Sequence, residues 1–204
     1  MAKLYFKYGA MGSSKSAQAL ITQFNYEELG MTVWLIKPSV DDRDGANIVK
    51  SRVGLSREAE VITPEDSIRA RYAATGGRDV IIADEAQFFM PGQIDELRDI
   101  VDELGVPVLC FGLRTDFLTH MFPGSMRLME LADSITEIKT VCACGSKATV
   151  NARVTPDGRI VTEGEQVFLG GNDSYIAMCH KCYQDYINEH RKVELLHGTE
   201  RDPQ

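Results

Sequence analysis

The sequence feature that most constrains the fold is a glycine-bearing turn near the start, GAMGSSKS (residues 9–16). It follows the alternating segment LYFKY, which predicts a β-strand. The segment after it predicts a helix, with apolar residues at Ala17, Leu20, Ile21 and Phe24. This order is that of a phosphate-binding P-loop, in which backbone N–H groups and the helix N-terminus face the phosphates. In such a loop Lys15 meets the outer phosphates and the Ser16 hydroxyl can hold magnesium.

The turn departs from the P-loop pattern at one position. Ser14 stands directly before the lysine, where glycine is usual. If that position needs a left-handed backbone, serine costs about 1–2 kcal/mol relative to glycine, and Gly12 can absorb part of the strain. The octapeptide alone therefore leaves a second interpretation open, a simple strand-to-helix turn with a surface lysine.

Composition indicates an ordinary globular protein. The chain has 204 residues, enough for one domain and a small accessory unit. Because its formal net charge is −8, we expect no nucleic-acid partner. No segment approaches the apolar length of a membrane span and the N-terminus lacks the pattern of a secretion signal, so we expect a cytoplasmic protein without a membrane partner.

Strand and helix patterns alternate after the turn. Strands are predicted within 31–38, 60–62, 79–89, 106–113 and 134–141. Helices are predicted up to Gly30 and over about 64–75, 92–104 and 125–132. The segment 39–52 is expected to be a solvated turn, although it follows a strand end on the side where open α/β sheets bind ligands. This alternation predicts an α/β fold of the P-loop (RecA-like) type, a mostly parallel sheet with helices on both faces.

The character of the sequence changes at about Val141. Cysteine pairs bracket two strand-like segments, KATVNARV (147–154) and EQVFLGG (165–171), and a polar helix is predicted from about Lys181. We therefore expect a nucleotide-binding core over 1–140, a small second domain over 141–190 and a frayed tail over 191–204.

A second nucleotide-binding element supports the P-loop interpretation. In VIIADE the acids Asp84 and Glu85 end an apolar strand, as in a Walker B element, whose carboxylate orients magnesium. Many strands end in an acid, but a P-loop followed by this element is far more specific than either alone. Glu85 could accept a proton from an attacking hydroxyl, as in a small-molecule kinase, or from water, as in an ATPase. The alternative is that Glu85 only hydrates the strand end.

The late cysteines have the spacing of zinc ligands. Cys142 and Cys144 form one close pair, and Cys179 and Cys182 form another. Four thiolates suit a closed, structural Zn²⁺ site, with buried free thiols as the alternative. Cys110 lies inside an apolar strand and is expected in the core.

Five segments together resemble a known family: LYFKYGAM, DEAQFF, VPVLCFGLRTDF, EIKTVCACG and EGEQVFLGGNDSYIAMC. They are similar to the cytosolic, type II thymidine kinases, in particular the bacterial form, from about Leu4 to Tyr183. The resemblance implies transfer of a phosphoryl group from ATP to the 5′-hydroxyl of thymidine with Mg²⁺, giving dTMP for DNA synthesis. It also implies a structural zinc, feedback inhibition by dTTP, and a homotetramer or dimer.

The resemblance further implies roles for individual residues. Glu85 would be the general base, with Ser16 and Asp84 at the magnesium. The ATP and phosphate site would comprise Gly9, Ala10, Met11, Gly12, Ser13, Ser14, Lys15, Ser16, Asp84, Glu85, Ala86 and Gln87. The nucleoside site would comprise Met11, Asp41, Arg43, Phe88, Phe117, Phe122, Gln166, Val167, Phe168, Leu169, Gly170 and Tyr175. Residues 166–170 would belong to a lasso-like loop that closes over thymidine and that the zinc site anchors. For Phe88, Phe117 and Phe122, ordinary core packing is the alternative.

Two rival functions remain at this point. A P-loop ATPase would use Glu85 to polarise water, although a typical helicase motor has two such cores and this chain has room for one. A zinc-ribbon module would bind nucleic acid or protein, with the glycine turn incidental, but the net charge and the absence of a basic-aromatic stripe disfavour nucleic acid.

Overall fold

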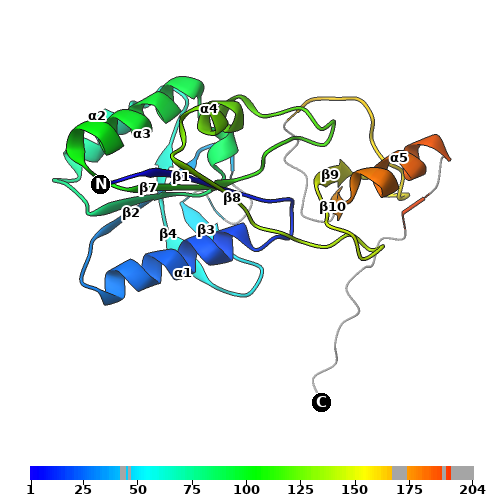
Figure 1. Ribbon diagram of the computed structural model, residues 1–204, viewed down its shortest axis with the longest axis horizontal. Helices are drawn as coiled ribbons and strands as arrows, with labels where there is room; N and C mark the ends of the chain where they lie inside the picture. Colours follow the sequence, from blue (N-terminus) through cyan, green and yellow to red (C-terminus); the bar gives the residue numbers. More distant parts are fainter. Residues whose placement is uncertain (42–44, 46, 167–173, 190–191, 194–204) are drawn as a thin grey trace, which may run out of the picture.

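The computed structural model describes residues 1–41, 45, 47–166, 174–189 and 192–193 (Figure 1). Its centre is a six-stranded sheet in the order β5-β2-β6-β7-β1-β8, and every neighbouring pair is parallel. The strands are β1 (Leu4–Tyr8), β2 (Val33–Pro38), β5 (Glu60–Ile62), β6 (Val80–Ala83), β7 (Val108–Gly112) and β8 (Ser134–Glu137). The predicted α/β fold with a parallel sheet is confirmed.

Helices cover both faces of this sheet (Figure 1). One face packs against α2 (Ile68–Ala74), α3 (Pro91–Leu104) and α4 (Pro123–Leu131), and the other against α1 (Lys15–Glu28). Successive side chains of a strand point to opposite faces. Thus Ile81 and Ala83 of β6 join the first core and Val80 and Ile82 the second.

Two predicted helices differ in detail from the structure. The predicted apolar face of α1 was partly wrong, because Ile21 and Phe24 are about half exposed. The buried positions include Lys15, Ala19 and Gln23, one turn apart, so the helix is rotated to bring the Lys15 ammonium into the loop.

Helix α2 begins at Ile68, four residues later than the predicted start at Pro64. The Asp66 carboxylate accepts the Thr63 N–H at 2.8 Å and closes a turn, and the Ser67 hydroxyl caps the helix by accepting the Ala70 N–H at 3.1 Å.

The segment after β2 contains a hairpin that the prediction of a solvated turn missed. Strands β3 (Ile48–Lys50) and β4 (Ser56–Glu58) pair antiparallel. The fully buried Lys37 ammonium donates to the Ile48 carbonyl at 2.9 Å and so ties the hairpin to the main sheet. The hairpin loop therefore stays close to the carboxyl end of β2.

The second unit consists of β9 (Val150–Arg153), β10 (Tyr175–Met178) and α5 (His180–Asn188) around its own apolar cluster. Strand β9 falls in the predicted segment 147–154. The other predicted strand, 165–171, lies mostly outside the described residues, and β9 pairs instead with β10. Figure 1 shows the unit beyond the end of the sheet, and the Asn151 side chain accepts the Met11 N–H, so the unit contacts the phosphate loop. Among the described residues, no helix has the length and apolarity needed to cross a membrane.

Candidate active site

The main cavity lies at the carboxyl ends of the parallel strands, the edge at which open α/β sheets bind ligands. Both units contribute to its wall. The predicted site residues that line it are Met11, Gly12, Ser14, Lys15, Ser16, Asp41, Asp84, Glu85, Gln87, Phe88, Phe117, Phe122, Gln166 and Tyr175. Four other predicted residues, Gly9, Ala10, Ser13 and Ala86, do not line this cavity. Arg43, Val167, Phe168, Leu169 and Gly170 lie outside the described residues.

The backbone of the phosphate loop is left-handed at Gly12 and at Ser14. Ser14 adopts the left-handed conformation, with φ 63° and ψ 30°, and Gly12 has φ 75°. A Cβ at Gly9 would lie 2.4 Å from the Ile138 carbonyl oxygen, so only glycine fits there. The Lys15 ammonium donates to the carbonyls of Gly9 and Ala10 at 3.1 Å each. The lysine is thus already held against the inside of the loop.

Asp84 follows β6 and is almost completely buried. Among the residues that the structure describes, its Oδ1 has no hydrogen-bond partner. Burial, and then the neighbouring Glu85 carboxylate, raise the pKa of Asp84 to about 7, although the Ser16 hydroxyl bonds to it and acts in the opposite direction. A carboxylate and a hydroxyl in contact suit Mg²⁺, and a cation here would favour the ionised carboxylate.

Glu85 is held in a strained backbone. Its φ is 50°, in the left-handed region, immediately before the short helix η1 (Ala86–Phe88). The buried Gln87 amide donates to Glu85 Oε2 at 2.5 Å and accepts the Leu113 N–H at 2.9 Å. Gln87 therefore fixes the Glu85 carboxylate relative to the end of β7.

Three phenylalanines line one side of the cavity. The rings of Phe88 and Phe122 meet edge to face with centroids 5.4 Å apart. Phe117 is 1% exposed and lies under the Arg153 guanidinium, 3.7 Å from the ring centroid. Arg153 also donates to the Tyr175 hydroxyl and to the Glu165 carbonyl, which connects the aromatic wall to the second unit.

Asp41 enters the cavity from the end of β2. Its carboxylate lies 3.2 Å from the buried Lys37 ammonium. The β3–β4 hairpin brings residues 49–53 to the same wall, and these include the cations Lys50 and Arg52. Lys50 and Arg52 were not among the predicted site residues, because the polar composition of this segment is typical of a solvated turn.

Asp116 and Asn151 also line the cavity and were not among the predicted site residues. Asp116 Oδ1 accepts the backbone N–H groups of Leu118 and His120, and its Oδ2 accepts the Gln166 amide at 2.9 Å. Asn151 is 3% exposed. A polar residue within the otherwise apolar start of β9 was the signal that could have pointed to it.

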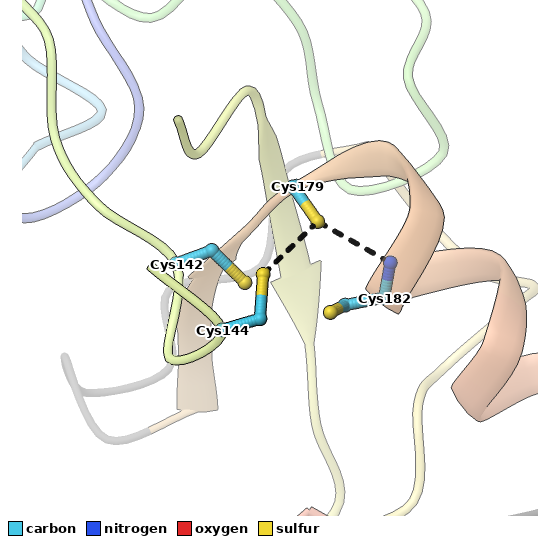
Figure 2. A group of neighbouring side chains, drawn as sticks. All are labelled: Cys142, Cys144, Cys179 and Cys182. Atoms are coloured by element: carbon cyan, nitrogen blue, oxygen red, sulfur yellow. Dashed lines mark hydrogen bonds between the residues drawn. The ribbon is translucent and has the colours of Figure 1, made fainter. Parts of the chain in front are cut away.

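The four late cysteines converge, as predicted (Figure 2). Their sulfur atoms all lie within 4.8 Å of one another, and those of Cys144 and Cys179 are 3.7 Å apart. Tetrahedral zinc with Zn–S bonds of about 2.3 Å separates its sulfurs by about 3.8 Å, so the cluster fits this ion. Hydrogen bonds from Ser146 lower the pKa of Cys144 to about 6, whereas the Cys179 and Cys144 thiols raise that of Cys182 to about 12. Neighbouring thiolates repel one another, and a divalent cation would remove that repulsion.

Comparison with known proteins connects this geometry to one family. The family model for thymidine kinase matches residues 2–183. The chain is 44% identical to the thymidine kinase of Ruegeria pomeroyi over 91% of this chain and 95% of the relative. The thymidine kinase of Salmonella typhimurium is 43% identical over 93% of this chain and 94% of the relative, and that of Yersinia pestis is 44% identical over 92% and 97%. The chain therefore belongs to the thymidine kinase family, as its sequence motifs predicted.

Proposed function

We propose that this protein transfers the γ-phosphoryl group of ATP to the 5′-hydroxyl of thymidine and so supplies dTMP for DNA synthesis. One observation carries the proposal. A single cavity takes in the phosphate loop, the Asp84–Glu85 pair and the aromatic side chains of Phe88 and Phe122. A nucleoside stacked against the aromatic wall would direct its sugar toward the carboxylates and the phosphate loop.

The ATP and phosphate site is proposed to comprise residues 9–16 with Asp84, Glu85, Ala86 and Gln87, of which Gly9, Ala10, Ser13 and Ala86 do not line the cavity itself. Lys15 would turn from the Gly9 and Ala10 carbonyls to the outer phosphates, and the loop N–H groups would bind phosphate oxygens. Ser16 and Asp84 would hold Mg²⁺, which when bound neutralises the charge that develops on the phosphate oxygens.

Glu85 is the proposed general base that accepts the 5′-hydroxyl proton. Gln87 donates to Oε2 of this carboxylate at 2.5 Å, which orients the group that would accept the proton. Gln87 itself is anchored by the Leu113 N–H at 2.9 Å. This contact gives the base a fixed orientation, which transfer between two bound substrates requires.

The nucleoside end is proposed to comprise Met11, Asp41, Arg43, Phe88, Phe117, Phe122, Gln166, Val167, Phe168, Leu169, Gly170 and Tyr175. Gln166 reaches the core through its bond to Asp116, and Tyr175 through Arg153. These bonds tie both sides of the 166–175 segment to the cavity wall. A segment held in this position would cover the nucleoside and exclude water from the transferred phosphoryl group.

Zinc is proposed to stabilise this covering unit. Cys142 and Cys144 lie before β9, and Cys179 and Cys182 lie at the start of α5, so one ion would close the chain around the whole lasso segment. We accordingly assign 1–140 to the kinase core, 141–190 to the zinc-binding lasso domain and 191–204 to a tail. From the family resemblance we further propose inhibition by dTTP, assembly as a homotetramer or dimer, and a cytoplasmic location.

The test is a two-substrate kinase assay. Purified protein with Mg²⁺ and γ-labelled ATP should pass the label to thymidine, and omission of the nucleoside should abolish most ATP turnover. Steady ATP hydrolysis that thymidine does not alter would contradict the proposal and favour an ATPase. Addition of dTTP to the same assay should lower the rate, and a rate unchanged by dTTP would remove the feedback proposal alone.

A further inference from the structure

Asn151 joins two walls of the cavity through the two polar atoms of its side-chain amide. Its Oδ1 accepts the Met11 N–H at 2.8 Å, and its Nδ2 donates to the Thr115 carbonyl at 2.8 Å. Met11 belongs to the phosphate loop, whereas Thr115 begins the loop that carries Asp116 and Phe117. The two segments lie about a hundred residues apart in the sequence. Asn151 comes from neither of them but from β9 of the second unit.

The chemistry of this link requires an amide. The residue must present an acceptor to one backbone N–H and a donor to one backbone carbonyl, and a carboxamide offers both on adjacent atoms. Asn151 is 3% exposed, so loss of the amide would leave a poorly solvated donor on Met11 and a poorly solvated acceptor on Thr115. The arrangement therefore has a steep energetic preference for asparagine.

The same face of β9 carries a second contact to the nucleoside wall. Residues two positions apart on a strand point to the same side, and Arg153 lies two positions after Asn151. Its guanidinium covers the Phe117 ring at 3.7 Å. One strand face thus contacts the phosphate loop, the Thr115 backbone and the Phe117 ring.

We infer that Asn151 is a positioning residue for phosphoryl transfer, which sets the phosphate loop and the Thr115–Phe117 segment at the separation that the reaction needs. The inference rests on the proposed function, because it matters only if two substrates meet in this cavity. It follows that the second unit does more than cover the nucleoside, since it also fixes the distance between donor and acceptor. A displacement of about 1 Å between reacting groups can lower a rate about 100-fold.

The test replaces the amide by an apolar side chain of similar shape, Asn151→Leu, and compares it with Gln93→Met. Gln93 is a matched control: it is 5% exposed, accepts the Met90 N–H and donates to the Thr63 and Asp66 carbonyls, but it does not line the cavity. Each variant loses a buried amide that bridges backbone groups of separate segments. Steady-state kinetics with ATP and thymidine, the melting temperature and the zinc content are measured for both.

We expect Asn151→Leu to lower kcat by about 10–100-fold, with smaller changes in both KM values, while Gln93→Met loses comparable thermal stability and keeps its kcat within about twofold. Asn151→Ala, which leaves room for water to bridge Met11 and Thr115, should lose less activity than the leucine variant and is measured if that variant does not fold. Equal falls in kcat for the Asn151 and Gln93 variants, or an unchanged kcat in the Asn151 variants, would overturn the inference. Wild-type protein that does not phosphorylate thymidine would instead overturn the proposed function.

Discussion

The left-handed backbone of Ser14 predicts that replacing this serine by glycine changes the stability of the protein but not its affinity for ATP. A residue with a Cβ at φ 63° costs about 1–2 kcal/mol that glycine does not. The glycine in turn gives the unfolded chain about 0.4–1 kcal/mol of extra conformational entropy. Ser14→Gly should therefore stabilise the protein by about 1 kcal/mol, since the exposed Ser14 side chain makes no capping hydrogen bond that the change would remove. For a chain of this size that gain raises Tm by about 2–4 °C.

The affinity for ATP should not change when Ser14→Gly raises the stability. Ser14 has the left-handed conformation, and if the loop keeps this backbone when ATP binds, the strain is the same in both states and cancels from the binding free energy. We expect the dissociation constant for ATP, measured by calorimetry, to stay within about twofold of wild type. From the sequence alone the strain at Ser14 could oppose ATP binding, and this measurement distinguishes the two outcomes.

Gly12→Ala is the reciprocal control. Gly12 has φ 75°, and the one described atom that a Cβ there would meet is the tip of the Arg52 side chain at 3.9 Å, so the cost is backbone strain without a clash. This variant should lower Tm where Ser14→Gly raises it, and Ser14→Ala, which keeps the Cβ, should leave Tm within about 1 °C. A Ser14→Gly protein that melts lower than wild type, or that binds ATP tenfold more tightly, would refute the reasoning.

Three further predictions concern the carboxylates and the cysteines. Glu85→Gln should lower kcat by about 10²–10⁴-fold with ATP affinity nearly intact in a binding assay, and an unchanged rate would remove Glu85 from the role of base. The pKa of Asp84 is raised to about 7 in the folded protein, from 3.8. Between these pH values the folded protein holds a proton that the unfolded chain releases. The stability that this proton contributes is fully present below about pH 4 and is lost as pH rises through 7. Without magnesium or nucleotide, the Tm of Asp84→Asn minus that of wild type should therefore grow between pH 5 and 8, and a constant difference would contradict this. Cys182→Ser should lose zinc by elemental analysis, whereas Cys110→Ala, in the buried strand β7, should keep it, and full zinc in the first variant would show the ligand assignment to be wrong.

Much of the central fold followed from local patterns. The strands around Ile36, Ile82 and Leu109 are continuous apolar runs, as strands buried on both faces must be, and glycines such as Gly105 end the helices between them. The β3–β4 hairpin could not be predicted in this way. Every residue of β4 is exposed, and the hairpin is held by the single buried side chain of Val49 in β3 and by a hydrogen bond from the distant Lys37 ammonium.

Some residues of the site could be predicted from local sequence patterns and others could not. Lys15, Asp84 and the four cysteines stand in motifs whose spacing carries the chemistry, and the structure brings each set together. Asn151 acts on backbone groups of two other segments, and a backbone N–H has no signature in the sequence. Such residues become visible only when the fold supplies their partners.

The strand order also determines when this protein can complete its fold during synthesis. Strand β1 is made first, yet its two neighbours in the sheet are β7 and β8, with Leu4 opposite Val108 and Tyr5 opposite Ser134. At about 5–20 residues per second the ribosome needs roughly 5–30 s to supply them. Until then the strand that carries the phosphate loop has no partner in the sheet, so nascent chains that stop before β7 should bind no nucleotide and should depend on chaperones to shield Leu4 and Phe6.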